Sequence, residues 1–322
     1  MSIRCAAPDE QTLNEAVSCL AGGGVVVMPT ETVYGLAGST QDDDALNTIY
    51  RIKGRPRDNP LIAHVLDPDG ARSITTGWDT RCDRLADAFW PGPLTMVLGR
   101  SDTVPATASG GRDTIAVRCP SHPAARALLT AFGGPISAPS ANQSGSVSPT
   151  TAQHVVEDLS DTNEELLIID GGPCELGIES TVVDLTRNPA RILRPGSITE
   201  AMLNNVIGDV DASRVSDQEA SPGTRSRHYA TTTPIHLIDD RELCSAMDSS
   251  TDRFVVIATT GLDGVEHLIE LPPDPVGYAE GLYSAMRRAD ALGVDRILVV
   301  HPGDGSAWCA VLDRLARATS TD

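Results

Sequence analysis

Lysine is almost absent from this chain. Of its 322 residues, 25 are lysine or arginine, and Lys53 is the only lysine among them. If a bias in base composition has replaced lysine by arginine wherever arginine is tolerated, a lysine remains only where arginine would not function. The survival of this lysine by chance is a real alternative. A tight pocket for a phosphate or carboxylate is such a place, because an ammonium is compact and a guanidinium is wide. Lys53 is therefore a candidate functional residue.

Long apolar runs and paired cysteines are also missing. No run approaches the roughly 20 apolar residues of a membrane-spanning helix, and the first residues do not have the pattern of a signal peptide. We therefore expect a soluble, cytoplasmic protein without membrane contact. The seven cysteines form no C-x-x-C pair, which argues against a disulfide framework and a structural zinc site. Aromatic residues make up 3% of the chain, so the core must consist of Val, Leu, Ile and Ala.

Positive charge is scarce overall, since the formal net charge is −19. Proteins that bind nucleic acid through its phosphates usually present a basic field, so any RNA contact here must be local. Several common catalytic and nucleotide-binding motifs are absent as well: the Walker A loop, G-x-G-x-x-G, G-x-S-x-G and H-E-x-x-H. These absences exclude the best-known nucleotide-binding loops and the usual hydrolase nucleophiles.

The apolar pattern alternates between short runs and amphipathic stretches, which predicts an α/β architecture. Three helices are expected in the first part of the chain. The first covers residues 9–21, the second begins after a capping segment at 42–44, and the third runs from Ser121 to Phe132. The expected strands are residues 25–28, 61–65, 94–98, 115–117, 135–138, 166–169 and 181–185.

A polar linker is predicted at residues 208–233, which are rich in Ser, Thr, Asp, Gly and Pro. It divides a first domain, 1–207, from a smaller α/β domain, 234–322. The expected elements of the second domain are strands at 234–238, 254–258 and 297–300 and helices at 276–292 and 308–318.

Three polar segments follow predicted strands or helices. Pro29–Ala37 (PTETVYGLA) supplies hydroxyls and a carboxylate where a strand ends, which is where open α/β sheets bind ligands. Lys53–Leu61 (KGRPRDNPL) gathers three cations at a helix end, more than the helix dipole requires, and indicates a polyphosphate clamp. Ser137–Ser148 (SAPSANQSGSVS) offers hydroxyls and small side chains that let backbone N–H groups approach phosphate. Each segment alone also fits an ordinary turn, cap or flexible loop.

The linker contains a local basic and aromatic cluster, Ser221–Tyr229 (SPGTRSRHY). A solvated linker has little reason to group Arg225, Arg227, His228 and Tyr229. A lid that closes over a bound nucleotide would need such residues.

In combination these motifs resemble the YrdC-like family, in particular its long, two-domain threonylcarbamoyl-AMP synthases. PTETVYGL, KGRP with NPL, WPGPLT, SAPSAN, ESTVVDL, ILRPG and the linker RHY occur in the family's order. The resemblance covers nearly the whole chain. It implies a twisted, mixed first sheet with helices and a concave ligand cavity, followed by a Rossmann-like C-terminal domain. Thr224 and Ser226 replace bulkier residues of the family linker, so the sequence does not fix how tightly the lid packs on the first domain.

The resemblance also implies a reaction: L-threonine, bicarbonate or carbon dioxide, and ATP, accompanied by Mg²⁺, give threonylcarbamoyl-AMP and pyrophosphate. A tRNA threonylcarbamoyl transferase complex would then modify the adenosine beside the anticodon, and direct tRNA binding by this chain stays open. The family pattern assigns threonine to Thr32, His64, Arg118 and Ser180. It assigns the nucleotide to Lys53, Arg55, Asn59, Thr114, Ser140, Asn142, Ser148, Arg194 and Tyr229. Lys53 and Arg55 would face the phosphates as the catalytic pair, and no protein ligands for a metal are expected.

Two other classes of protein remain as alternatives. YrdC-like domains resemble concave RNA-binding surfaces, so a non-catalytic RNA-binding or ribosome-maturation protein is one, and the net charge of −19 counts against it. The other is the carbamoyl-transfer protein of hydrogenase maturation, whose paired C-x-x-C fingers this sequence lacks.

Overall fold

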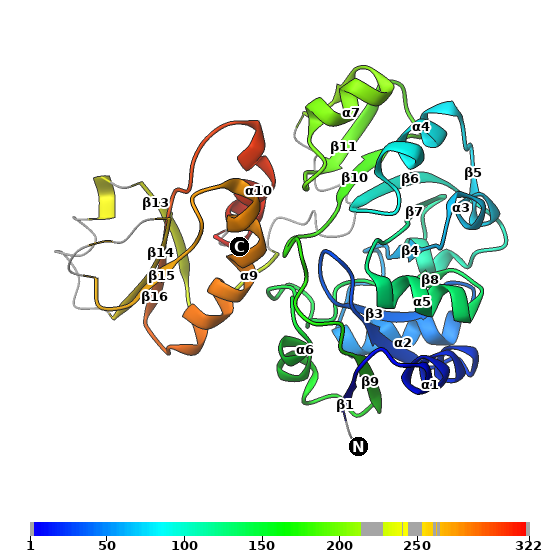
Figure 1. The fold of residues 1–322 in the computed structure, drawn as a ribbon, viewed down its shortest axis with the longest axis horizontal. Helices are drawn as coiled ribbons and strands as arrows, with labels where there is room; N and C mark the ends of the chain where they lie inside the picture. The colour runs from blue at the N-terminus through cyan, green and yellow to red at the C-terminus, as the bar shows by residue number, and fades with distance from the viewer. Residues whose placement is uncertain are drawn as a thin grey trace.

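The computed structural model describes residues 3–213, 228–239, 241–243, 253–259, 262 and 265–319. In this part of the chain the strands form two separate sheets, each with its own helices (Figure 1). The described residues form α/β layers, as predicted.

The first sheet has the strand order β1-β9-β2-β3-β8-β4-β7-β6-β10-β11-β12, and β5 pairs with β6. It is mixed, because β2 and β3 are antiparallel whereas β4 and β7, and β6 and β10, are parallel. The strands are β1 (Ile3–Ala6), β2 (Val25–Met28), β3 (Gly35–Ser39), β4 (Ile62–His64), β5 (Thr75–Thr76), β6 (Leu94–Arg100), β7 (Thr114–Arg118), β8 (Ile136–Ser137), β9 (Leu166–Ile169), β10 (Thr181–Asp184), β11 (Ala190–Arg194) and β12 (Val210–Asp211).

Helices cover this sheet and begin where the sequence supplies caps. The Asp9 side chain accepts a hydrogen bond from the Thr12 backbone N–H, and Asp42 accepts from the backbone of Asp44 and Ala45, which confirms the capping segment predicted at 42–44. The helices are α1 (Glu10–Ala21), α2 (Asp43–Lys53), α3 (Pro68–Ile74), α4 (Thr80–Phe89), α5 (Pro123–Phe132), α6 (Ala152–Leu159) and α7 (Glu200–Ile207).

The second sheet is smaller and parallel, with the order β13-β16-β14-β15. Its strands are β13 (Ile235–Ile238), β14 (Phe254–Ala258), β15 (Leu268–Glu270) and β16 (Arg296–Val300), and its helices are α9 (Pro275–Ala291) and α10 (Cys309–Ala318). A parallel sheet with connecting helices is the predicted Rossmann-like arrangement.

The helices of the second sheet lie on the side that faces the first domain (Figure 1). Arg287 of α9 forms an ion pair with Asp158 of α6 at 2.5 Å. One apolar cluster also crosses the boundary, since Val33, Val147 and Ile178 pack with buried side chains of α9 and α10. The two domains are therefore packed against each other through a continuous core.

β12 pairs with β11 and reaches Asp211, so the first sheet extends beyond residue 207, where the first domain was predicted to end. Most of the predicted lid, residues 221–227, lies outside the described residues; His228 and Tyr229 lie within them. Among the described helices, none has the length and apolar character needed to cross a membrane.

Candidate functional site

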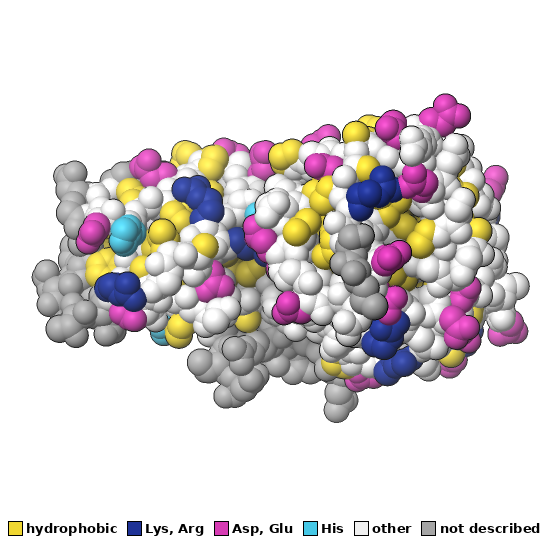
Figure 2. Space-filling view, turned by 90° about the horizontal axis from the view of Figure 1, so that it is seen from below, with side chains coloured by type: hydrophobic (Ala, Val, Ile, Leu, Met, Phe, Trp, Pro, Cys, Tyr) yellow, Lys and Arg dark blue, Asp and Glu magenta, His cyan; other side chains and the backbone are white. Residues whose placement is uncertain are grey.

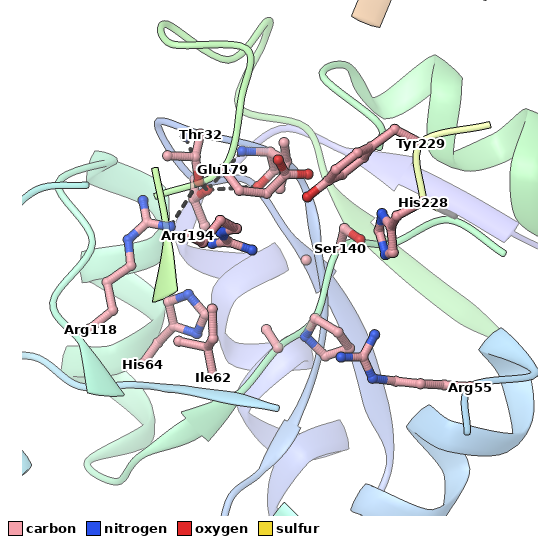
Figure 3. A pocket seen from close by; sticks show the side chains of 15 residues that line it. Thr32, Arg55, Ile62, His64, Arg118, Ser140, Glu179, Arg194, His228 and Tyr229 are labelled. Atoms are coloured by element: carbon pink, nitrogen blue, oxygen red, sulfur yellow. Dashed lines mark hydrogen bonds between the residues drawn. The ribbon is translucent and has the colours of Figure 1, made fainter. Parts of the chain in front are cut away.

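A pocket opens where the ends of several strands meet the linker residues His228 and Tyr229 (Figure 3). Seven of the residues predicted for the site line it: Thr32, Arg55, His64, Arg118, Ser140, Arg194 and Tyr229. They come from segments up to about two hundred positions apart in the sequence, so the fold assembles the site. In Figure 3, Arg118 and His64 lie on one side, and Arg55 lies with Ser140 and His228 on the other.

Arg118 ends β7 and is held by three groups. Its Nη2 lies 2.7 Å from Glu31 Oε1, its Nη1 donates to Thr32 Oγ1 at 2.8 Å, and its Nε donates to the Gly92 carbonyl. The Arg118 and Glu31 side chains are both buried, and the guanidinium lowers the pKa of the Glu31 carboxyl against the effect of burial. A guanidinium fixed in this way is pre-oriented for a planar, negatively charged group such as a carboxylate.

Both pocket histidines are neutral at physiological pH. Burial, reinforced by Arg118, lowers the pKa of His64 to about 3. Burial also lowers the pKa of His228 to about 3 against the opposing effect of the Glu179 carboxylate, and the nearby cations act in the same direction as burial. A neutral imidazole can accept a hydrogen bond from an incoming donor.

The opposite side of the pocket depends on two anchored cations. Arg55 donates to the carbonyls of Asn59 and Pro60 and to the Asn59 side chain. Lys53 is 1% exposed, and its Nζ donates to the carbonyls of Ser140 and Asn142 at 2.5 Å each. Lys53 therefore does not line the pocket but lies beneath the loop that does, and its burial lowers its pKa well below the usual value.

The other predicted residues divide into supporting and distant positions. Asn59, Asn142, Ser148 and Ser180 do not line the pocket, but each hydrogen-bonds to a residue that lines it or to Lys53. Thr114, by contrast, is at the start of β7, at the opposite end of the strand from Arg118. A nucleotide contact by Thr114 stays a prediction.

Sequence reasoning missed residues that reach this site from the C-terminal domain. Arg314 of α10 and Tyr283 of α9 both donate to Glu179 Oε2, at 2.9 and 2.8 Å. Glu179 lines the pocket. No local pattern marks Arg314, because an arginine in an amphipathic helix is usually solvent-exposed and its partner is 135 positions away.

Metal-binding groups are not prominent here. Within the described ranges, no cluster of three or more His, Cys, Asp or Glu side chains could hold a metal ion. The pocket carboxylate of Glu179 is already occupied by Ser148, Tyr283 and Arg314.

The pocket is thus cationic and hydroxyl-rich inside a protein of net charge −19. Fold and site together define a two-domain α/β protein whose pocket suits a small anionic ligand, with Arg118 placed to pair with a carboxylate. A family model described as telomere recombination matches residues 18–196, and one described as the C-terminal domain of threonylcarbamoyl-AMP synthase matches residues 198–320. The chain belongs to the family of two-domain threonylcarbamoyl-AMP synthases.

Individual relatives are similar to this chain over nearly its whole length. Threonylcarbamoyl-AMP synthase of Pyrococcus abyssi is 36% identical, with 97% of this chain and 95% of the relative covered. The Bacillus subtilis synthase is also 36% identical, with 96% and 93% covered. The crystal structure of the P. abyssi protein complexed with L-threonine superposes with a TM-score of 0.91 at 35% identity, covering 99% of this chain and 98% of that one.

Proposed function

We propose that this protein is a nucleotidyltransferase that forms threonylcarbamoyl-AMP and pyrophosphate from L-threonine, bicarbonate or carbon dioxide, and ATP. The observation that carries the proposal is the single pocket with Arg118, Thr32 and His64 on one side and Arg55 and Ser140 on the other. The P. abyssi relative is known as a complex with L-threonine, and the same ligand fits the chemistry of the Arg118 side.

The chemistry needs no covalent enzyme intermediate. The threonine amine attacks the carbon of carbon dioxide and loses a proton, which gives a carbamate. A carbamate oxygen then attacks the α-phosphorus of ATP, the bond to the bridging oxygen breaks, and pyrophosphate leaves with that oxygen. Positioning and charge stabilisation are sufficient for both steps, which agrees with the absence of a nucleophile–base pair in the sequence.

On the threonine side, the Arg118 guanidinium would pair with the carboxylate of the amino acid. Thr32 already accepts from Arg118 and shares a hydrogen bond with Thr30, so its hydroxyl is fixed near the same ligand. The neutral imidazole of His64 can accept from the amine or the hydroxyl of threonine. Ser180, which accepts from Arg194, supports this side from behind.

On the nucleotide side, Arg55 and Arg194 would neutralise phosphate charge, and the Ser140–Asn142 loop, held by Lys53, would supply hydrogen-bond donors. Tyr229 would border the nucleoside, and Asn59, Asn142 and Ser148, which bond to Arg55, Lys53 and Glu179 respectively, would support this side of the pocket. We propose that Mg²⁺ arrives bound to the triphosphate oxygens of ATP.

The product would pass to a tRNA threonylcarbamoyl transferase complex, and a cytoplasmic location fits a reaction that uses ATP and serves tRNA. A non-catalytic RNA-binding role is not favoured. On the face shown in Figure 2, the basic side chains of the described residues lie in small separate groups among acidic ones, whereas RNA binding needs a continuous basic surface.

The test is direct. Purified protein is incubated with labelled threonine, bicarbonate, ATP and Mg²⁺, and pyrophosphate and the labelled adenylate are measured. We expect both products, and neither when threonine is omitted. Pyrophosphate release that does not depend on threonine, or no product from folded protein, would refute the proposal.

A further inference from the structure

The carboxylate of Glu179 is a meeting point of the two domains. Its Oε1 accepts from Ser148 Oγ at 2.6 Å, within the first domain. Its Oε2 accepts from Tyr283 OH at 2.8 Å and from Arg314 Nε at 2.9 Å, both in the second domain. Three donors therefore fix a buried carboxylate, and two of them come from the smaller sheet's helices.

Arg314 is committed to this contact. It is 0% exposed, and all three guanidinium nitrogens donate within the protein: Nε to Glu179, Nη1 to the Pro195 carbonyl and Asp313, and Nη2 to the Glu179 carbonyl. A buried charge needs such pairing. Unlike Arg118, Arg314 does not line the pocket, so any effect it has on the reaction must pass through the residues it holds.

Those residues form a wall of the pocket. Glu179 lines the pocket and precedes Ser180, whose Oγ accepts from the pocket residue Arg194. Tyr229, also a lining residue, has the Arg314 guanidinium 5.4 Å from its ring centroid and the Tyr283 ring stacked at 5.5 Å. Side chains of the second domain therefore hold both Glu179, just before β10, and Tyr229 of the linker.

Tyr229 shows why such support is needed. Its backbone φ is +63°, the only positive value among the described residues other than glycine. A bulky residue pays for this left-handed conformation in free energy and keeps it only where its surroundings fix it. The Tyr283 ring and the Arg314 guanidinium beside Tyr229 provide that constraint.

A second ion pair across the same boundary offers a comparison. Arg287 of α9 pairs with Asp158 of α6 and donates to the Val147 carbonyl. Neither Arg287 nor Asp158 lines the pocket, and neither takes part in the three hydrogen bonds that fix the Glu179 carboxylate. Arg287 therefore joins the domains, whereas Arg314 joins the second domain to the pocket wall.

We propose that Arg314 and Tyr283 are positioning residues of the active site, through which the C-terminal domain holds Glu179 and Tyr229 in the geometry that binds the nucleotide. This inference rests on the proposed function, because its effect is measured on ATP use. The second domain would thus position residues of the active site in addition to supporting the linker.

The experiment compares Arg314→Gln with Arg287→Gln, each of which removes one ion pair between the domains. Steady-state pyrophosphate release gives kcat and the KM for ATP and for threonine, and thermal unfolding gives stability. We expect Arg314→Gln to lower kcat/KM for ATP by roughly 10- to 100-fold, mainly through KM, with a smaller change in the KM for threonine. Arg287→Gln should change kcat/KM for ATP by no more than about twofold, even if it lowers the unfolding temperature as much as Arg314→Gln does.

Tyr283→Phe keeps the stacked ring and removes only the hydroxyl bond to Glu179, so it serves if Arg314→Gln does not fold. Tyr283→Phe should also raise the KM for ATP, by a smaller factor than Arg314→Gln does. The double change Glu179→Gln with Arg314→Gln removes both buried charges and should recover stability relative to Arg314→Gln alone.

Two results would overturn the inference: wild-type ATP kinetics in Arg314→Gln or Tyr283→Phe, or equal kinetic losses in Arg314→Gln and Arg287→Gln at equal stability. An inactive wild-type protein would instead refute the proposed function, so the two failures are distinguishable.

Discussion

Lys53 has an environment that arginine would not fit. Its Nζ contacts two backbone carbonyls, those of Ser140 and Asn142, under the loop that borders the pocket. A guanidinium is wider and planar and cannot take the place of a compact ammonium between two carbonyls without moving them. The only lysine of the chain is thus explained by the loop it holds, and a further phosphate contact stays a prediction.

We expect Lys53→Arg to lower kcat/KM for ATP by roughly 10- to 100-fold, because a displacement near 1 Å of a substrate-binding loop has about that effect. Arg51→Lys, an exposed position on the same helix, is the matched control and should keep wild-type kinetics. Pyrophosphate release under varied ATP concentration measures both. Wild-type kinetics in Lys53→Arg would show that the lone lysine is an accident of composition.

At the scale of elements, the end of α2 sets the direction of the phosphate-side cations. Gly54 caps the helix in the left-handed region, with φ +58°, and separates Lys53 from Arg55. Gly133 caps α5 in the same way, with φ +72°, away from the pocket. A Cβ at either position would meet no atom within 4 Å, so only backbone strain opposes a side chain there.

Gly54→Ala and Gly133→Ala should therefore each destabilise the protein by about 1 kcal/mol, measured by chemical denaturation. Only Gly54→Ala should also raise the KM for ATP, because relaxation of the strain shifts Lys53 or Arg55. If both variants keep the wild-type KM, the cap does not direct these cations.

The elements themselves were largely predictable from sequence. Expected strands at 25–28, 166–169 and 254–258 coincide with β2, β9 and β14, because a buried strand needs only a short apolar run between turn residues. The order of the strands was not predictable. β4 lies between β8 and β7, and pairing between segments so distant in sequence leaves no local pattern.

For the candidate site, the sequence indicated which residues take part but not where their side chains point. Arg55 and Arg118 were marked by cation clusters and strand ends, and both line the pocket. Local sequence does not show that Lys53 points under the loop or that Ser180 lies behind the pocket wall, since side-chain direction depends on tertiary packing. Arg314 was missed for the same reason.

At the scale of the whole molecule, buried titratable groups should make the fold sensitive to acid. The pKa values of His64 and His228 are about 3, against an ordinary value near 6.5, so below pH 6.5 the unfolded chain binds protons that the folded chain excludes. Stability is therefore present above pH 6.5 and falls as the pH drops from about 6.5 toward 3. The Glu179 carboxyl, whose pKa the cations Arg314 and Arg194 lower to about 2 despite burial, adds the same sign below about pH 4.3.

Between pH 5 and 6 the effect comes from imidazoles whose pKa is lowered, including His154, where burial is the main cause. His64 and His228 should each contribute a slope of up to about 1.4 kcal/mol per pH unit to the free energy of unfolding. His228→Asn should therefore reduce the measured slope by about that amount, whatever it does to stability at pH 7. His236→Asn removes an exposed imidazole and should leave the slope unchanged. Denaturant titrations followed by tryptophan fluorescence at several pH values measure all three proteins. An unchanged slope in His228→Asn would mean that the folded and unfolded states bind the His228 proton alike, which would contradict a pKa lowered by burial.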